Sequence, residues 1–116
     1  MDIGLDELAS RLGQVRVVDV RRRDEYDGSG GNACDPRQGH IPGAINLDVH
    51  ELLALTEDEL RERIDVEPGG EVVCYCHSGS RSAYAAQALS RFGYEARNYP
   101  GSWHEWSRTE LPLETT

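Results

Sequence analysis

Cys76 is the residue of this sequence best placed to do chemistry. It ends the apolar run Val72–Cys76, and the segment after it, His77-Ser78-Gly79-Ser80-Arg81, leads into a helical pattern that continues to Phe92. We therefore expect Cys76 at the carboxyl end of a strand, with a tight loop and the start of a helix directly after it. Open α/β sheets carry their chemistry at this edge.

The surroundings predicted for Cys76 favour its thiolate. The backbone N–H groups of a short loop can converge on an anion, and the start of a helix adds a positive dipole. Arg81 adds a full positive charge at the end of the loop. A thiol in such a field loses its proton more easily than free cysteine does. The sequence thus predicts a nucleophilic cysteine in an anion-binding loop, and the alternative is a buried strand cysteine with no chemistry.

The elements that position this loop follow from the hydrophobic pattern. Strands are predicted over residues 15–20, 44–47, 71–76 and 94–99. Helices are predicted over residues 22–27, 50–55, 56–64 and 81–92. A further helix capped by Asp6 is expected before the first strand, and a last helix carries Trp103 and Trp106. Thr56 and Glu59 have the spacing of a capping box. Alternating strands and helices predict one α/β domain, residues 1–116, with a mostly parallel sheet covered on both faces.

A glycine-rich stretch separates the first two predicted strands. Residues 28–39 contain four glycines together with Asn32, Asp35 and Pro36. A long loop of this kind in a small domain is either a binding loop or a disordered segment. Cys34 lies within it and could serve as a resolving thiol for Cys76, although an incidental cysteine is the preferred interpretation.

Composition narrows the range of partners. The 116 residues carry a formal charge of −9, which argues against nucleic acid and against anionic membrane surfaces. The sequence has no apolar run of transmembrane length and no signal-peptide pattern, so we expect a cytoplasmic protein. Three cysteines do not suggest a disulfide framework. No second pair of Cys or His lies at ligand spacing from Cys74 and Cys76, so we expect no metal.

Four stretches of the chain resemble one known family. Cys76-His77-Ser78-Gly79-Ser80-Arg81 is similar to the active-site loop of the rhodanese family of sulfurtransferases. Three further stretches resemble the family in its own order: Val18–Arg21 followed by Glu25-Tyr26, Gly39–Leu47 (GHIPGAINL), and Gly101–Trp106 (GSWHEW). The resemblance covers the chain from about Ile3 to Leu113.

This resemblance implies a rhodanese-like α/β fold with about five strands. It also implies that Cys76 attacks the outer sulfur of a donor, becomes a persulfide, and passes that sulfur to a thiol or to cyanide. Thiosulfate is the first-choice donor, and a protein is a further candidate acceptor. No cofactor is implied, and we expect a monomer or a weak dimer.

The resemblance assigns roles to further residues. Arg81 and Arg21 would bind the anionic donor, and the alternative for each is an ordinary ion pair, with Glu25 or another acid in the case of Arg21. Asp19 is expected to be structural and to accept backbone N–H bonds. The loop residues expected to bind the donor, mainly through their backbone, are His77, Ser78, Gly79, Ser80 and Ser82. Three further residues are expected to have supporting roles: His40, Trp103 and Trp106.

Other functions stay open at this stage. Ser78-Gly79 resembles the mercaptopyruvate branch of the family, in which the matching serine is catalytic, whereas Arg81 fits that branch poorly. A non-enzymatic persulfide carrier or interaction module is a further alternative. Phosphatases and arsenate reductases use a related loop that is one residue longer than the six residues of Cys76–Arg81, so we consider these two activities the least favoured.

Overall fold

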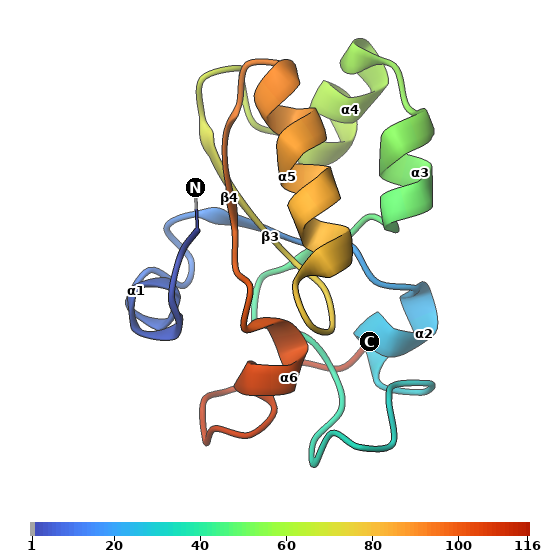
Figure 1. Ribbon diagram of the computed structural model, residues 1–116, viewed down its shortest axis with the longest axis vertical. Coiled ribbons are helices and arrows are strands. Elements are labelled where there is room, and N and C mark those ends of the chain that lie inside the picture. Colours follow the sequence, from blue (N-terminus) through green and yellow to red (C-terminus); the bar gives the residue numbers. More distant parts are fainter. Residues whose placement is uncertain (1) are drawn as a thin grey trace.

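A parallel sheet lies at the centre of the molecule. The structure is a computed structural model that describes residues 2–116, and it confirms an α/β fold with helices on both sides of the sheet (Figure 1). The strand order is β2-β1-β3-β4, and every pair is parallel. The strands are β1 (Arg16–Asp19), β2 (Ile45–Asn46), β3 (Glu71–Tyr75) and β4 (Glu95–Asn98).

In the described part of the chain, residues 2–116, six helices connect and cover these strands. They are α1 (Leu5–Ser10), α2 (Arg23–Asp27), α3 (Val49–Ala54), α4 (Glu57–Ile64), α5 (Ser80–Arg91) and α6 (Ser102–Trp106). The predicted capping box of α4 is confirmed, since Thr56 accepts the Glu59 N–H and the Glu59 side chain accepts the Thr56 N–H. The predicted cap of α1 is wrong: Gly4 is the N-cap, and Asp6 lies in the first turn, where its charge favours the helix dipole.

The expected number of about five strands is wrong by one. The sheet of residues 2–116 has four strands, and the amino-terminal segment contributes only an isolated parallel bridge from Asp2 to Asn98. That segment runs beside β4 for a single pair because α1 begins at Leu5. It therefore lengthens the edge of the sheet without forming a strand.

The side chains of alternate residues in the central strands point to opposite faces of the sheet and pack into two separate hydrophobic cores. Val18, Val72 and Cys74 pack with helices α3, α4 and α5 on one face. Val17, Val73 and Tyr75 pack with α1 and α6 on the other, where Trp103 and Trp106 lie. Because both faces are covered, β3 is almost entirely apolar, as a buried parallel strand requires.

The carboxyl ends of β1, β3 and β4 meet at one edge of the sheet. Cys76 follows β3 at this edge, Arg21 follows β1 closely, and the turn from Tyr99 to Ser102 follows β4.

The segment 28–39 contains no helix or strand, and Arg37 joins it to the carboxyl-terminal segment by donating to the carbonyls of Trp106, Ser107 and Leu111. Within residues 2–116, no helix combines the length and apolar character that crossing a membrane requires.

Candidate active site

Cys76 lies under a short loop that directs hydrogen bonds at its sulfur. The residue is 1% exposed and comes directly after β3. Its Sγ accepts the Gly79 N–H at 3.1 Å and the Ser82 hydroxyl at 3.4 Å. Gly79 is the N-cap of α5 and Ser82 belongs to its first turn. The strand, the loop and the helix start therefore place two donors on one sulfur atom.

These donors give Cys76 a different acidity from that of its neighbour. Burial opposes ionisation of Cys76, but hydrogen bonds from Ser82 and from the N–H groups of Gly79 and Ser78 outweigh it, so the pKa of Cys76 is lowered. Cys74 is fully buried in the same apolar cluster, and desolvation raises its pKa to about 12. The two thiols are two residues apart, and of the two only Cys76 has the lowered pKa that favours a nucleophilic thiolate.

Gly79 is required by the path of the loop. Its φ is +97°, a conformation that side chains rarely adopt. A Cβ at this position would also lie 2.8 Å from the Pro100 carbonyl oxygen and 2.9 Å from the Pro100 Cα. The loop therefore packs directly against the backbone that follows β4, and this contact holds the Gly79 N–H over Cys76.

Ser102 hydrogen-bonds to the backbone of Cys76, and this role was not predicted from the sequence. Its hydroxyl accepts the Cys76 N–H at 3.1 Å and donates to the Tyr99 carbonyl at 2.8 Å. The residue is fully buried and has φ +56°, an uncommon value for serine. Its position in the Gly101-Ser102-Trp103 stretch was the only available signal. The Cys76 carbonyl in turn accepts the Trp103 N–H at 2.9 Å, so α6 is bound directly to the backbone of Cys76.

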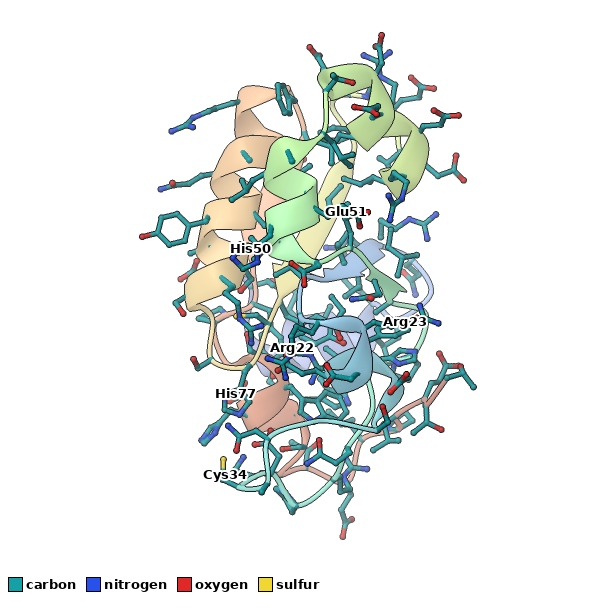
Figure 2. The ribbon with its side chains drawn as sticks, turned by 90° about the vertical axis from the view of Figure 1, so that its right-hand side faces the viewer. Arg22, Arg23, Cys34, His50, Glu51 and His77 are labelled. Atoms are coloured by element: carbon teal, nitrogen blue, oxygen red, sulfur yellow. The ribbon has the colours of Figure 1, made fainter. Side chains whose placement is uncertain are left out.

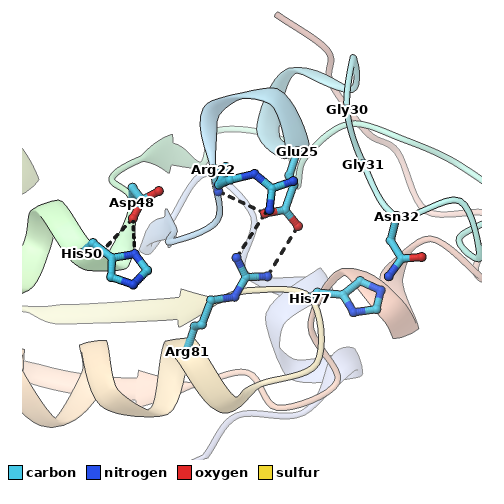
Figure 3. Close-up of a pocket in the computed structure, with 9 residues that line it drawn as sticks. All are labelled: Arg22, Glu25, Gly30, Gly31, Asn32, Asp48, His50, His77 and Arg81. Atoms are coloured by element: carbon cyan, nitrogen blue, oxygen red, sulfur yellow. Dashed lines mark hydrogen bonds and ion pairs between the residues drawn. The ribbon is translucent and has the colours of Figure 1, made fainter.

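Arg81 and Glu25 form an ion pair beside the loop. The distances are 3.1 Å for Nη1–Oε1 and 3.4 Å for Nη2–Oε2 (Figure 3). Burial opposes ionisation of Glu25, but its bonds to Arg81 and to the Arg22 N–H lower its pKa, so it is a carboxylate at neutral pH. The Arg81 side chain is 33% exposed, so its guanidinium can still meet an anion from solvent.

A pocket of about 560 Å³ opens beside this pair. Two of its lining residues, His77 and Arg81, are drawn in Figure 3 and belong to the loop that begins at Cys76. The other lining residues come from α2, from the glycine-rich segment and from the start of α3: Arg22, Glu25, Gly30, Gly31, Asn32, Asp48 and His50.

Arg21 is buried away from this pocket's lining. Its side chain is 1% exposed, and its Nη2 lies 2.7 Å from Asp19 Oδ2 and 2.7 Å from the Gly39 carbonyl oxygen. Asp19 also accepts the Arg21 N–H and the Tyr75 hydroxyl. This geometry corresponds to the ion-pair alternative for Arg21, with Asp19 as the partner, whereas Glu25 pairs with Arg81.

The other predicted site residues occupy varied positions. Ser78 and Ser80 are exposed, and Ser78 lines a separate hollow with Pro100, Gly101 and His104. His40 is buried, stacks on Tyr26 at 3.7 Å between ring centroids, and bonds to the Tyr26 carbonyl through Nδ1. The indoles of Trp103 and Trp106 are fully buried and donate to the carbonyls of Arg37 and Pro112.

Fold and site together define an α/β domain built around an activated cysteine between a strand and a helix. The family model described as "Rhodanese-like domain" matches residues 4–109. The chain therefore belongs to the rhodanese-like domain family.

Named relatives agree with this membership. The chain is 37% identical over 122 residues to a thiosulfate sulfurtransferase of Corynebacterium glutamicum, an alignment that covers 91% of this chain. A crystal structure of a probable thiosulfate sulfurtransferase superposes with a TM-score of 0.86 at 42% identity and covers 97% of this chain. The human single-domain sulfurtransferase TSTD1 superposes with a TM-score of 0.71 at 34% identity and covers 94% of this chain.

These relatives differ in length from the present chain. The chain spans 40% of the Corynebacterium protein and 47% of the crystallised one. It spans 96% of TSTD1. The similarity therefore covers one part of the longer relatives and nearly all of the human protein.

Proposed function

We propose that this chain is a sulfurtransferase that moves a sulfane sulfur from thiosulfate to a thiol or to cyanide through a persulfide on Cys76. The observation that carries the proposal is the geometry of Cys76: one sulfur, donors at 3.1 and 3.4 Å, and a lowered pKa. The names of the thiosulfate sulfurtransferases at 37% and 42% identity support the choice of donor.

The first half-reaction is a displacement at sulfur. The Cys76 thiolate attacks the outer sulfur of thiosulfate, and a Cys76–sulfur bond forms as the bond to the sulfite sulfur breaks. Sulfite leaves with the electron pair of that bond, and the protein keeps a persulfide anion. The charge moves from Sγ to the outer sulfur, still close to the N–H groups of the loop, which favour negative charge there.

The second half-reaction returns the free thiolate. Cyanide or an acceptor thiolate attacks the outer sulfur and leaves as thiocyanate or as a new persulfide, and the electron pair of the broken bond returns to Cys76 Sγ. No cofactor enters the balance of either step. This is covalent catalysis in two steps, so ping-pong kinetics are expected.

We assign separate roles to the two arginines. Arg81 is partly exposed in the pocket, and we propose that it binds the anionic sulfonate end of thiosulfate. Arg21 is buried and bound to Asp19 and to the Gly39 carbonyl, so we propose that it positions the sheet edge without meeting the donor. His77 and the loop backbone complete the donor site.

The alternative donor, mercaptopyruvate, depends on Ser78. That side chain lines a hollow together with His104 and Gly101, which differs from the pocket lined by Arg81. We therefore keep thiosulfate as the proposed donor. A comparison of kcat/KM for the two donors tests this choice, and a higher value for mercaptopyruvate would reverse it.

Thiocyanate formation tests the proposed activity itself. The chain is incubated with thiosulfate and cyanide, and thiocyanate is measured against protein concentration. Many equivalents per chain indicate an enzyme, and one equivalent at most indicates a sulfur carrier. Cys76→Ala should abolish formation, and Cys34→Ser, which removes an exposed thiol, is the matched control. Activity that survives in Cys76→Ala would refute the assignment.

A further inference from the structure

Four side chains of metal-binding types meet beside the Cys76 loop. Cys34 and Asp35 come from the segment 28–39, His77 follows the nucleophile, and His104 lies on α6; their ligand atoms all lie within 4.8 Å of one another. Figure 2 shows Cys34 and His77 at the same end of the molecule. We propose that these four side chains form a binding site for a divalent transition-metal ion of the Zn²⁺ type.

Asp35 lies at the centre of the cluster. Its Oδ2 is 3.0 Å from His77 Nε2, and its Oδ1 is 3.8 Å from Cys34 Sγ and 3.9 Å from His104 Nδ1. In a tetrahedral zinc site, bonds of about 2.0–2.3 Å place neighbouring ligand atoms about 3.4 Å apart. The Asp35 Oδ2–His77 Nε2 pair is within about half an ångström of that separation, and Cys34 Sγ and His104 Nδ1 lie similarly close to the other oxygen of the same carboxylate.

One oxygen of Asp35, among residues 2–116, faces the His77 ring nitrogen without a hydrogen bond. The carboxylate is 1% exposed, and within residues 2–116 its Oδ2 is a buried atom that accepts no hydrogen bond, although such an atom normally has a partner. Its Oδ1 accepts a hydrogen bond from Arg108 Nη1 at 3.0 Å and lies 3.2 Å from His77 Nε2. Arg108 can therefore hold Oδ1 while Oδ2 binds metal, and such outer partners orient metal-binding carboxylates.

The ligand set selects the kind of ion. One sulfur, two imidazole nitrogens and one carboxylate oxygen suit Zn²⁺ or Co²⁺, whereas Mg²⁺ and Ca²⁺ require oxygen ligands. Two of the ligands are reachable from solvent, since Cys34 is exposed and the His104 side chain is 52% exposed. Cys34 releases its thiol proton to water when the sulfur–metal bond forms, and His77 binds through Nε2 with its proton on Nδ1.

An ion in this site would join three segments of the edge where Cys76 lies. His77 is the residue after the nucleophile, its carbonyl accepts the His104 N–H at 2.9 Å, and its side chain lines the pocket beside Arg81. The ion would therefore fasten the glycine-rich segment to the Cys76 loop. The binding itself requires no sulfur transfer, so its test is independent of the proposed function.

Metal titration of the full, untagged chain tests the site. Cys76→Ser removes the nucleophilic thiol as a competing ligand, with Cys76→Ala as a second version, and circular dichroism verifies the fold of each. Calorimetry should give one Zn²⁺ per chain. Co²⁺ should give the visible absorption of a tetrahedral ion and a thiolate-to-cobalt charge-transfer band. Mg²⁺ in excess should not displace either ion.

Variants in the same background identify the ligands. Cys34→Ser should remove the charge-transfer band, and both Cys34→Ser and His104→Asn should weaken Zn²⁺ binding by at least about tenfold. The control is His50→Asn, whose side chain is 89% exposed and lies outside the cluster; it should leave affinity unchanged. The proposal is overturned if both Cys76 variants bind no Zn²⁺, or if binding survives the loss of Cys34 and His104.

Discussion

A comparison of Cys74 with Cys76 shows how a few hydrogen bonds change the pKa of a buried thiol. Both are buried in the same apolar cluster at the end of β3. Desolvation raises the pKa of Cys74 to about 12, whereas hydrogen bonds at the start of α5 outweigh desolvation and lower the pKa of Cys76. At the scale of single residues, reactivity is therefore set by which thiol receives donors.

The Ser82 hydroxyl is one of those donors, and its removal should be measurable. Ser82→Ala should raise the pKa of Cys76, because the Oγ–H donor at 3.4 Å is lost, and should lower kcat/KM for thiosulfate at pH 7 about tenfold. Alkylation by iodoacetamide across pH, in a Cys34→Ser background, reports the pKa. Ser80→Ala is the matched control, since Ser80 is exposed. Equal pH profiles for the two variants would contradict the assigned role.

The same lowered pKa makes stability depend on pH in a defined direction. Because the folded pKa of Cys76 lies below the unfolded value of about 8.5, the thiolate's contribution is complete above that value. It is lost as pH falls through the folded pKa. On acidification the parent chain should therefore lose free energy of unfolding relative to Cys76→Ala. Urea denaturation at several pH values measures it, and a difference independent of pH would contradict the lowered pKa.

Arg81 should affect donor binding more than folding. Arg81→Ala should raise the KM for thiosulfate about tenfold, the size expected for loss of one hydrogen bond to a charged group. It also leaves Glu25, which is 5% exposed, with fewer partners. The double variant Glu25→Gln/Arg81→Ala separates the two effects: it should recover stability against urea but keep the raised KM. An unchanged KM in Arg81→Ala would remove its binding role.

At the scale of elements, the loop depends on close packing between its turn and the chain after β4. Gly79→Ala should destabilise the fold more than Gly69→Ala does. Both positions have similar positive φ, +97° and +92°, but only the Cβ at Gly79 would meet another backbone, that of Pro100. The positive φ alone costs about 1–2 kcal/mol. Urea denaturation gives the comparison, and equal losses would show that the Pro100 contact is unimportant.

The elements that could be predicted from sequence are those with local signals. The Thr56–Glu59 capping box, the apolar run of β3 and the helical spacing of α5 each lie within one short window, and the structure reproduces them. The bond from Cys76 to Ser102 joins residues 26 positions apart, and the Arg81–Glu25 pair joins residues 56 apart. Such pairs depend on how the sheet edge assembles, and nothing in the local pattern indicates them.

At the scale of the whole molecule, residues from distant parts of the chain lie together at the carboxyl end of the sheet. The expectation of no metal rested on ligand spacing along the sequence. Asp35 lies 42 residues from His77 and 73 from Arg108 in the sequence, yet both contact its carboxylate. Spacing rules detect sites within one motif and miss those assembled by the fold, which is why the proposed ion site was not foreseen.

The extent of the functional unit is also a question at this scale. We propose that this chain forms a single domain that transfers sulfur, because within residues 2–116 one four-stranded sheet carries both cores and the chain spans 96% of TSTD1. The purified chain alone should form thiocyanate over many turnovers. Its unfolding in urea should follow one transition by fluorescence and by circular dichroism. Two separate transitions would contradict a single domain.

The mass of the protein after treatment with thiosulfate tests the central claim most directly. The chain is exposed to thiosulfate without an acceptor, freed of excess reagent, and weighed intact and after fragmentation. The account predicts a gain of one sulfur atom, located on Cys76, absent from Cys76→Ala, and removed by cyanide. A chain that gains no sulfur, or that gains it on Cys34 or Cys74, would contradict the account.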